Sequence, residues 1–428
     1  MAAQNYAVTT GHFLKNITLQ FPKECSYCFA YGSGVFLQKN QKPGKMIDLI
    51  FVVDDPLKWH TRNLEMNYSH YSGLRRFGAK IITNIQERMA CGIYYNPFVK
   101  VDDALIKYGV ISTAALEDDL SKWTHLYVAG RLHKPVLDII PPTSPRILNL
   151  LQKNRDAALR AGLLLNSRCL RKTDLYYTIA ELSYMGDFRM AVGEHPDKVR
   201  NIVTPLVPYF DQIYYPLLEK LKPVVSIDKF GVITQEIDSN GRLTHLMGLP
   251  HPIQRSLARR IYRDPKFTDV EDAMVELSHV SNLSPYIRKS VAEVVWGSSI
   301  TQTLQGILSA GVIRSIKYGF EKVMKKVTAK ESNSKNVEAI VEEKGIIIPP
   351  PKTVELLKDS PKTREINQPN ESASDKDLVP IALNDPEAHK LGRVPRKINK
   401  EKAQNQKSGS RNGLNIVAAH KSKRKKLR

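Results

Sequence analysis

A glycine-rich turn in this chain is followed by an aspartate that begins a second apolar run. The turn is Gly32-Ser33-Gly34, and Asp48 is the first residue of the run. Glycine has no Cβ, so the backbone can approach a phosphate closely, and the serine hydroxyl adds a hydrogen-bond donor. An aspartate supplies the hard oxygen ligand that Mg²⁺ prefers. On adjacent strands, the turn and the carboxylate would form one site for a metal-bound triphosphate, although Gly-Ser-Gly alone is more often an ordinary turn.

This arrangement resembles the nucleotidyltransferase superfamily, which moves a nucleoside monophosphate from an NTP to an acceptor. Residues 35–38 are expected to begin a helix whose N-terminal N–H groups face the triphosphate. The superfamily carries a second carboxylate two residues after the first, where this chain has Ile50. Asp54 lies roughly 20 Å along a straight strand from Asp48, too far to share one metal ion. Further metal ligands must come from elsewhere, with Asp102, Asp103 and Asp187 as candidates.

Length and charge limit the classes of function. The chain has 428 residues, 42% of them apolar, which is enough for two or three domains with their own cores. Its net charge of +21 predicts anionic partners: a nucleotide, a nucleic acid or an acidic lipid. Cys25 and Cys28 lack the two further spaced ligands of a zinc site, so reduced intracellular cysteines are expected. Residues 294–313 are too polar for a transmembrane helix.

The sequence predicts an α+β fold with four parts. Residues 1–142 are expected to form a nucleotidyltransferase-type domain with a mixed sheet, and residues 143–298 a helical, winged-helix-like domain. In the first part, short apolar runs predict strands at 27–31, 48–53, 92–95, 108–112 and 126–132, with a helix at 79–90. In the second, Asn240-Gly241 predicts the turn of a β-hairpin. Such a module often binds nucleic acid, and a purely structural role is equally open.

The two remaining parts lie at the C-terminus. Residues 299–329 are expected to form an amphipathic helix, and residues 330–428 a disordered basic tail poor in aromatics. On the helix, Ile316 and Phe320 fall on an apolar face, whereas Arg314 and Lys317 fall largely opposite. A compact apolar face with a basic polar face suits an anionic membrane surface, and packing against the protein core is the alternative.

Several stretches occurring in order resemble the translocator assembly and maintenance family of mitochondrial phosphatidate cytidylyltransferases. The resemblance covers about residues 10–327 and excludes the tail. The stretches are Tyr31-Gly32-Ser33-Gly34-Val35-Phe36, Met46-Ile47-Asp48-Leu49-Ile50, Leu126-Tyr127-Val128-Ala129-Gly130-Arg131-Leu132-His133-Lys134-Pro135, Leu182-Ser183-Tyr184-Met185-Gly186-Asp187-Phe188-Arg189-Met190, Lys198-Val199-Arg200-Asn201-Ile202-Val203 and Ser309-Ala310-Gly311.

The resemblance implies synthesis of CDP-diacylglycerol from CTP and phosphatidic acid, with Mg²⁺ as cofactor and release of pyrophosphate. It implies an early step of cardiolipin synthesis and a peripheral position on the matrix side of the mitochondrial inner membrane. The absence of acidic residues before Glu24 fits a weak mitochondrial presequence, and a cytosolic N-terminus is nearly as compatible with the composition. The partners expected are CTP, phosphatidic acid and an anionic membrane surface, with no nucleic acid, and the oligomeric state stays open.

Roles for individual residues follow from the motifs. Ser33 and Asp48 are expected to be catalytic, with Asp48 as the metal ligand. Asp187 and Arg189 are expected to position the substrate, with local capping and pairing as the alternative. Residues expected to bind the nucleotide are Gly32, Ser33, Gly34, Arg131 and Lys134, and those expected to bind the membrane are Arg314, Ile316, Lys317 and Phe320.

Two other classes of function stay open. An RNA or tRNA nucleotidyltransferase would use the basic charge and the winged helix, but it would place base-stacking aromatic residues among the basic ones. The basic regions of this chain are poor in aromatics. A non-catalytic assembly factor with a degenerate transferase fold is compatible with Ile50 at the position of the second carboxylate.

Overall fold

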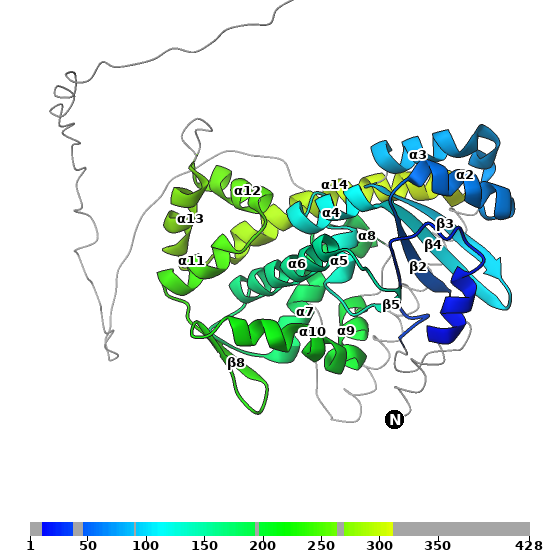
Figure 1. Cartoon of the computed structure of the whole chain (residues 1–428). Coiled ribbons are helices and arrows are strands. Elements are labelled where there is room, and N and C mark those ends of the chain that lie inside the picture. The colour runs from blue at the N-terminus through cyan, green and yellow to red at the C-terminus, as the bar shows by residue number, and fades with distance from the viewer. Residues whose placement is uncertain (1–10, 37–45, 90, 193–196, 263–268, 311–428) are drawn as a thin grey trace, which may run out of the picture. The chain divides into compact units, whose positions relative to one another are not determined.

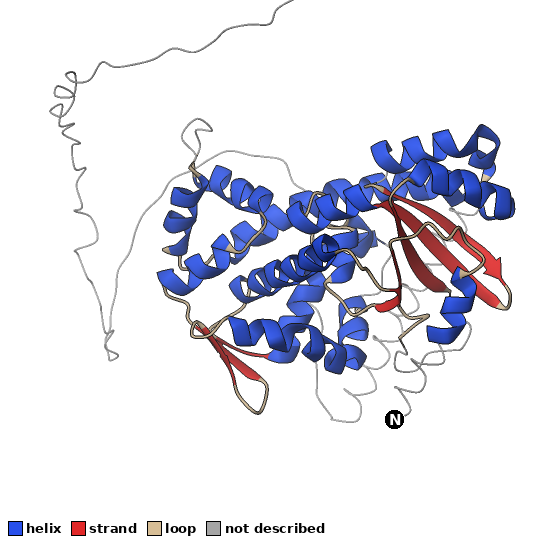
Figure 2. Cartoon of the chain, viewed as in Figure 1, coloured by secondary structure: helices blue, strands red, loops and turns tan. Residues whose placement is uncertain are grey.

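Two β-sheets and a set of helices make up the described part of the chain (Figures 1 and 2). The structure is a computed structural model. It describes residues 11–36, 46–89, 91–192, 197–262 and 269–310. All of these belong to one compact unit, residues 1–349, and the predicted tail lies outside the described residues.

The larger sheet is mixed and has the strand order β3-β4-β2-β1-β5. Strand β2 pairs antiparallel with β1 and parallel with β4. The four strands predicted between residues 27 and 112 are therefore confirmed, although β3 and β4 are longer than expected. The bounds are β1 Tyr27–Tyr31, β2 Ile47–Val53, β3 Ile93–Val101, β4 Ala104–Ser112 and β5 Leu137–Ile140.

The strand predicted at residues 126–132 is wrong, because this segment contains the short helix α5 (Val128–Leu132). A short apolar run is buried in a strand or in a helix, so its pattern does not separate the two. The deciding group is the buried carboxylate of Asp119, at the end of α4 (Thr113–Lys122). It accepts four backbone N–H bonds of 2.7–3.0 Å, from residues 125, 126, 128 and 129. These bonds satisfy N–H groups at the start of α5.

Side chains alternate between the two faces of the sheet, as the strand period of two requires. Tyr31 and Ile50 belong to the core shared with the helical region, whereas Leu49 and Phe51 belong to a second core with Trp59. Asp48 lies two residues before Ile50 and so points to the helical side. The helices and turns of the second face and its edge are α2 Pro56–Met66, η1 Tyr68–His70, η2 Gly73–Phe77 and α3 Gly78–Met89.

The helical region contains a second sheet of three strands in the order β6-β8-β7. The elements before its hairpin are α6 Pro145–Leu164, β6 Cys169–Arg171, α7 Lys172–Glu181, η3 Leu182–Tyr184, α8 Phe188–Val192, α9 Lys198–Val203, η4 Thr204–Leu206 and α10 Val207–Lys220. The remaining elements are β7 Val225–Ile227, β8 Val232–Gln235, α11 Ser239–Met247, α12 His251–Ile261, α13 Val270–Ser278 and α14 Ser284–Ala310.

The hairpin predicted around Asn240-Gly241 is wrong. These residues lie in α11, where Asp238 is the N-cap and its carboxylate accepts the N–H of Gly241 at 2.8 Å. Asp followed by small polar residues starts a helix as readily as it makes a turn. The hairpin joins β7 and β8 instead, and its Gly231 adopts φ +78°.

Helix α14 crosses the described region from α12 to β3 and α3 (Figure 1). It begins at Ser284 and passes through residue 299 without a break. In the described residues, no helix is both long and apolar enough to cross a membrane. The predicted membrane-binding residues Arg314, Ile316, Lys317 and Phe320 lie outside the described residues.

Candidate active site

A cavity of about 520 Å³ lies between the main sheet and the helical region, at the glycine turn. Six predicted site residues line it together: Gly32, Ser33, Asp48, Arg131, Lys134 and Arg189. Gly34 and Asp187 do not line it. Asp187 pairs with Arg189, which does, and Gly34 lies against the backbone of Met46. The other candidate carboxylates, Asp102 and Asp103, do not line this cavity, and Asp102 accepts a bond from Gln20 instead.

The glycine turn lies directly against the start of β2. Gly32 has φ +79°, and a Cβ there would lie 3.1 Å from Oδ2 of Asp48. A Cβ on Gly34 would lie 2.6 Å from the carbonyl oxygen of Met46. Both glycines are therefore needed to place the turn beside Asp48. Residues 32–36 form this turn, and most of the helix predicted from residue 35 falls in residues outside the described ranges.

Asp48 is held between two strands that bring complementary groups to it. In register it faces Tyr31 of β1 and Lys107 of β4, and Nζ of Lys107 lies 3.9 Å from Oδ1 of Asp48. Among the described residues that line the cavity, Asp48 is the only carboxylate. Ile50 also lines the cavity, so the position of the second superfamily carboxylate faces the site but carries no charge.

Among the described residues, no group of three or more His, Cys, Asp and Glu side chains could hold a metal ion. Protein side chains alone therefore do not complete a metal site there. Mg²⁺ in nucleotide sites is commonly held by one or two carboxylates, with substrate phosphates and water completing its shell. Asp48 beside the Ser33 hydroxyl in an open cavity fits that second kind of site.

Five cationic side chains line the same cavity, and tyrosine rings orient most of them. Cζ of Arg131 lies 4.3 Å from the ring centre of Tyr31, and Nζ of Lys107 lies 4.2 Å from that of Tyr95. Such cation–π contacts hold a charge in place without neutralising it. The cations are Lys107, Arg131, Lys134, Arg189 and Lys198. A cavity with five basic side chains and one carboxylate favours a ligand with several negative charges.

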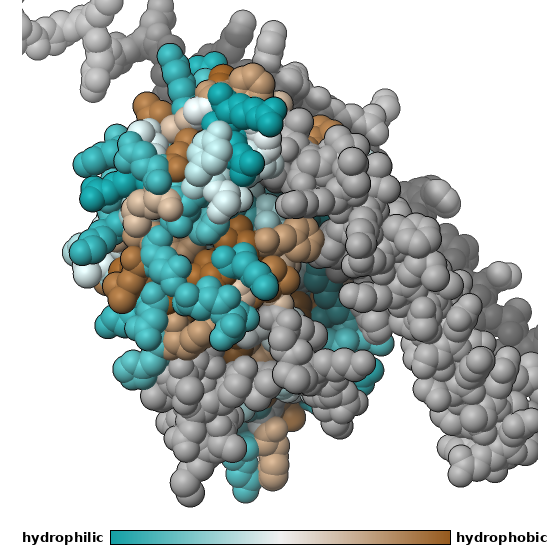
Figure 3. All heavy atoms as spheres, turned by 90° about the vertical axis from the view of Figure 1, so that its right-hand side faces the viewer, coloured by the Kyte–Doolittle hydropathy of each residue, from teal (hydrophilic) through white to brown (hydrophobic). Residues whose placement is uncertain are grey.

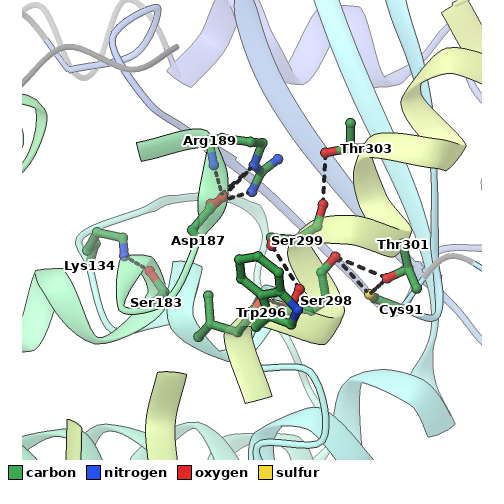
Figure 4. Close-up of polar contacts among 11 residues, drawn as sticks. Cys91, Lys134, Ser183, Asp187, Arg189, Trp296, Ser298, Ser299, Thr301 and Thr303 are labelled. Atoms are coloured by element: carbon green, nitrogen blue, oxygen red, sulfur yellow. Dashed lines mark hydrogen bonds and ion pairs between the residues drawn. The ribbon is translucent and has the colours of Figure 1, made fainter. Parts of the chain in front are cut away.

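Lys134 is the most deeply buried of these cations, with 1% of its surface exposed. Its Nζ donates to Oγ of Ser183 at 2.7 Å (Figure 4). It also donates to the carbonyl of Ala180 at 3.3 Å. Burial, and then the charges of Arg131 and Lys198, lower the pKa of Lys134 well below its ordinary value. An anion in the cavity would stabilise the charged form of this lysine.

Asp187 and Arg189 form an ion pair at the edge of the site (Figure 4). The guanidinium of Arg189 donates to both carboxylate oxygens of Asp187, at 2.7–3.1 Å. Asp187 is buried, so its carboxylate orients Arg189 while Arg189 itself lines the cavity. Gly186, at φ +78°, allows this turn to lie against α14, because a Cβ there would lie 2.6 Å from the carbonyl of Ala292.

Sequence reasoning missed part of the site. It did not select Lys107 or Lys198, although Lys198 begins one of the motifs that carried the family resemblance. It also missed Tyr184, whose ring centre lies 4.9 Å from Nζ of Lys134 and 4.6 Å from Nζ of Lys198. Lys107 can be recognised as a site residue only when the pairing of β4 with β2 is known, because that register places Lys107 opposite Asp48.

Helix α14 supplies the last wall of the cavity through Val295, Ser298 and Ser299. The two serine hydroxyls donate to the carbonyls of residues 295 and 296 within the helix. On another side of α14, Sγ of Cys91 lies 3.0 Å from Oγ1 of Thr301, which ties the helix to the start of β3 (Figure 4). The sequence predicted a membrane element only from residue 299 onward, and the role of α14 as a wall of the cavity was not foreseen.

Comparisons with known proteins identify the family of this chain. Residues 14–325 match the family described as "Phosphatidate cytidylyltransferase, mitochondrial". The protein of that name from Danio rerio is 40% identical to this chain, and the match covers 76% of this chain and 96% of the relative. The protein of that name from Homo sapiens is 39% identical, and the match covers 69% of this chain and 66% of the relative. A solved nucleotidyltransferase-like protein from Exiguobacterium sibiricum is 9% identical, with 80% of this chain and 96% of that one covered. The TM-score of this match is 0.20. The match of residues 14–325 to the family and the long matches to these relatives show that the chain belongs to the mitochondrial phosphatidate cytidylyltransferases.

Proposed function

We propose that this protein transfers CMP from CTP to phosphatidic acid, which yields CDP-diacylglycerol and pyrophosphate. The observation that carries the proposal is the cavity that joins the glycine turn, Asp48 and five cations in a chain of this family. CTP and phosphatidic acid are both polyanionic, so a reaction between them needs neutralisation of charge before the two phosphates can meet.

In the proposed reaction, an oxygen of the phosphatidate phosphate forms a bond with the α-phosphorus of CTP. The bond from that phosphorus to the bridging oxygen of the β-phosphate breaks, and pyrophosphate leaves with the electron pair. A phosphomonoester has its second pKa near about 6, so the attacking oxygen is already ionised at neutral pH and needs no general base. The protein's contribution is therefore positioning and charge neutralisation.

The geometry supports a division of roles among the residues. Gly32 and Ser33 would hold the triphosphate, because the turn presents its backbone and a hydroxyl beside Asp48. Arg131 and Lys134 lie together on the α5 side and would bind triphosphate or lipid phosphate. Mg²⁺ is the proposed cofactor, held by Asp48 and by phosphate oxygens. When bound, it would neutralise charge on the triphosphate and on the departing pyrophosphate.

A winged-helix-like architecture is proposed for the helical region. The order α6-β6-α7-α10-β7-β8, with β8 between β6 and β7, supports it. This region carries η3, whose Ser183 and Tyr184 contact Lys134 in the cavity. Its proposed role is thus to complete the active site and not to bind nucleic acid.

The first test is an assay of radiolabelled CTP with either phosphatidic acid or tRNA as the acceptor. We expect lipid-dependent and Mg²⁺-dependent release of pyrophosphate, with no labelled tRNA. Transfer to tRNA would favour the RNA nucleotidyltransferase, and no transfer to either acceptor would favour the assembly factor with a degenerate fold.

Replacing Gly32 by Val should lower cytidylyl transfer more than replacing Ser33 by Ala. A side chain at Gly32 meets both a positive φ and the Asp48 carboxylate at 3.1 Å, whereas Ser33→Ala removes one hydroxyl. Steady-state rates of both variants should be compared with that of Gly73→Ala, a matched control at a glycine with open space around it. Equal activity in Gly32→Val and the unaltered protein would exclude the phosphate-cradling turn.

We place the protein on the matrix side of the mitochondrial inner membrane, as a peripheral protein. The attachment is proposed for the later part of residues 299–329, because Ser299, Gln302 and Gln305 are buried in the protein. The family supports the mitochondrial part of this proposal. Figure 3 displays the face on the right of Figure 1, where the coloured hydrophilic and hydrophobic residues are interspersed. The proposed contact is the apolar face with Ile316 and Phe320, with Arg314 and Lys317 largely opposite.

Changing Ile316 and Phe320 to Asp should release the protein from cardiolipin-containing liposomes in a flotation assay. Each basic residue near an anionic surface contributes about 1 kcal/mol, and buried apolar area adds to this. Activity on phosphatidate in liposomes should fall much more than activity on a short-chain substrate in detergent. Equal losses on both substrates would indicate a helix packed in the protein core, and unchanged flotation would exclude the membrane contact.

A further inference from the structure

An exposed apolar stripe runs along α14 beside the catalytic cavity. Its members are Trp296, Ile300 and Leu304, whose surfaces are 53%, 37% and 57% exposed. They are spaced four residues apart, so they lie on one face of the helix and extend over about 12 Å of its axis. Large apolar side chains that are exposed next to one another mark a surface that contacts another molecule. We call these three residues the α14 stripe.

The apolar character of this helix face begins where α14 reaches the cavity. Before that point the exposed residues of the helix include Arg288, Lys289 and Glu293. Between residues 294 and 306 the helix carries no charged residue, and over the same stretch Val295 lines the cavity. The change from a charged to an apolar exposed face therefore coincides with the catalytic cavity.

Phe188 joins the α14 stripe to the charged part of the cavity. Its ring centre lies 6.3 Å from that of Trp296, in an edge-to-face arrangement. In the chain, Phe188 lies between Asp187 and Arg189. The buried carboxylate of Asp187 orients the guanidinium of Arg189, which lines the cavity (Figure 4). Neither aromatic ring lines the cavity itself, so an oriented cation at the cavity is followed directly by two aromatic rings outside it.

This order of groups matches the chemistry of phosphatidic acid. The phosphate of the lipid must enter the cavity to meet CTP, and an arginine binds phosphate through its planar set of N–H donors. The acyl chains are apolar, and a cavity with five basic side chains does not favour them. An exposed apolar surface directly outside the cavity does favour them, because contact with it removes apolar surface from water.

We propose that phosphatidic acid binds with its phosphate on Arg189 and with one acyl chain along Phe188 and the α14 stripe. The identity of the lipid rests on the proposed function, and the new element is where the lipid lies. The triphosphate of CTP then occupies the part of the cavity at the glycine turn, on the sheet side.

Trp296 itself reports the contact. The chain has three tryptophans, and the other two, Trp59 and Trp123, are each 1% exposed. The full chain is titrated, without CTP, with phosphatidic acid brominated on its acyl chains in detergent micelles, because bromine quenches tryptophan fluorescence on contact. We expect saturable quenching that unbrominated phosphatidic acid reverses. Brominated phosphatidylcholine at the same mole fraction is the control for a general micelle contact and should quench little.

Trp296→Ser should raise the KM for dioleoyl phosphatidic acid in detergent by about tenfold and leave the KM for CTP unchanged. With dibutyryl phosphatidic acid, whose chains are too short to follow the stripe, the change should be much smaller. A general loss of structure would affect both lipids and CTP alike. Leu304→Ser keeps the reporter and should weaken the quenching titration. The matched control is Tyr215→Ser, at an exposed aromatic residue of α10 that does not line the cavity.

Three results would overturn the proposal. Equal quenching by brominated phosphatidylcholine would indicate a general contact with micelles or bilayers. The absence of saturable quenching would show that no acyl chain meets Trp296, and an unchanged KM for dioleoyl phosphatidic acid in Trp296→Ser would show that the contact does not serve the reaction. Lipid-specific quenching without cytidylyl transfer would refute the proposed function alone, whereas transfer without quenching would refute only this position of the lipid.

Discussion

Asp48→Asn is expected to lower cytidylyl transfer by about a hundredfold or more at saturating Mg²⁺, a loss of about 2.7 kcal/mol of transition-state stabilisation. Asp48 is the only carboxylate among the described residues that line the cavity, so no neighbour there replaces its charge. In an amide, the anionic oxygen that would hold the metal is lost, while the size of the side chain is kept.

The fold should tolerate this change. The contact of Asp48 with Lys107 is long, at 3.9 Å, and the side chain is 23% exposed, so its removal should shift Tm by little. Asp103→Asn is the matched control, because Asp103 is an exposed carboxylate of the β3–β4 turn that does not line the cavity. More than about a tenth of normal turnover in purified Asp48→Asn would contradict the metal role.

The part of the site formed by the glycine turn and Asp48 could be predicted because it depends on local sequence. The turn at Gly32 and the strand that begins near Asp48 are contiguous features, and strands β1 and β2 confirm their placement. Arg131 and Lys134 were selected as well, but on a strand that does not exist. Their true positions depend on Asp119, whose carboxylate caps α5 through bonds to residues up to ten positions away. The periodicity of the apolar run does not predict these hydrogen bonds to Asp119.

The remaining parts of the site depend on tertiary contacts that a single sequence does not encode locally. Ser298 and Ser299 reach the cavity because Gly186 lets the Asp187 turn lie against α14. Likewise, Gly130 lets η3 approach α5, since a Cβ there would overlap with Cβ of Ser183. The sequence alone does not indicate that these two glycines permit close packing. Their function is to bring Ser183 to Lys134 and α14 to the cavity.

Lys134→Met is expected to lower turnover by a similar factor and to change the pH dependence of both stability and binding. The folded protein lowers the pKa of Lys134, mainly through burial, so the unfolded chain holds this proton more tightly. Stability therefore rises with pH up to the unfolded pKa near about 10.5, and it falls as pH falls toward the lower folded pKa. Urea unfolding of the ligand-free protein between pH 7 and 10 should give a weaker rise in Lys134→Met.

Binding of CTP should reverse that shift. A triphosphate beside Lys134 stabilises its charged form and raises its pKa, so the protein takes up protons on binding. Calorimetry at pH 8 in two buffers with different ionisation enthalpies measures this uptake, which should be smaller in Lys134→Met. Lys122→Met, at an exposed lysine of α4, is the matched control and should match the parent protein.

The same measurements separate a binding role of Lys134 from a structural one. If the lysine served only to hold η3 through Ser183, Lys134→Met would lower stability but leave proton uptake unchanged. If it meets the triphosphate, the affinity for CTP falls and the uptake decreases together. Equal proton uptake in the parent and in Lys134→Met would therefore exclude Lys134 from the nucleotide site, even if turnover were lost. A buried lysine that contacts no anion does not gain a proton when CTP binds.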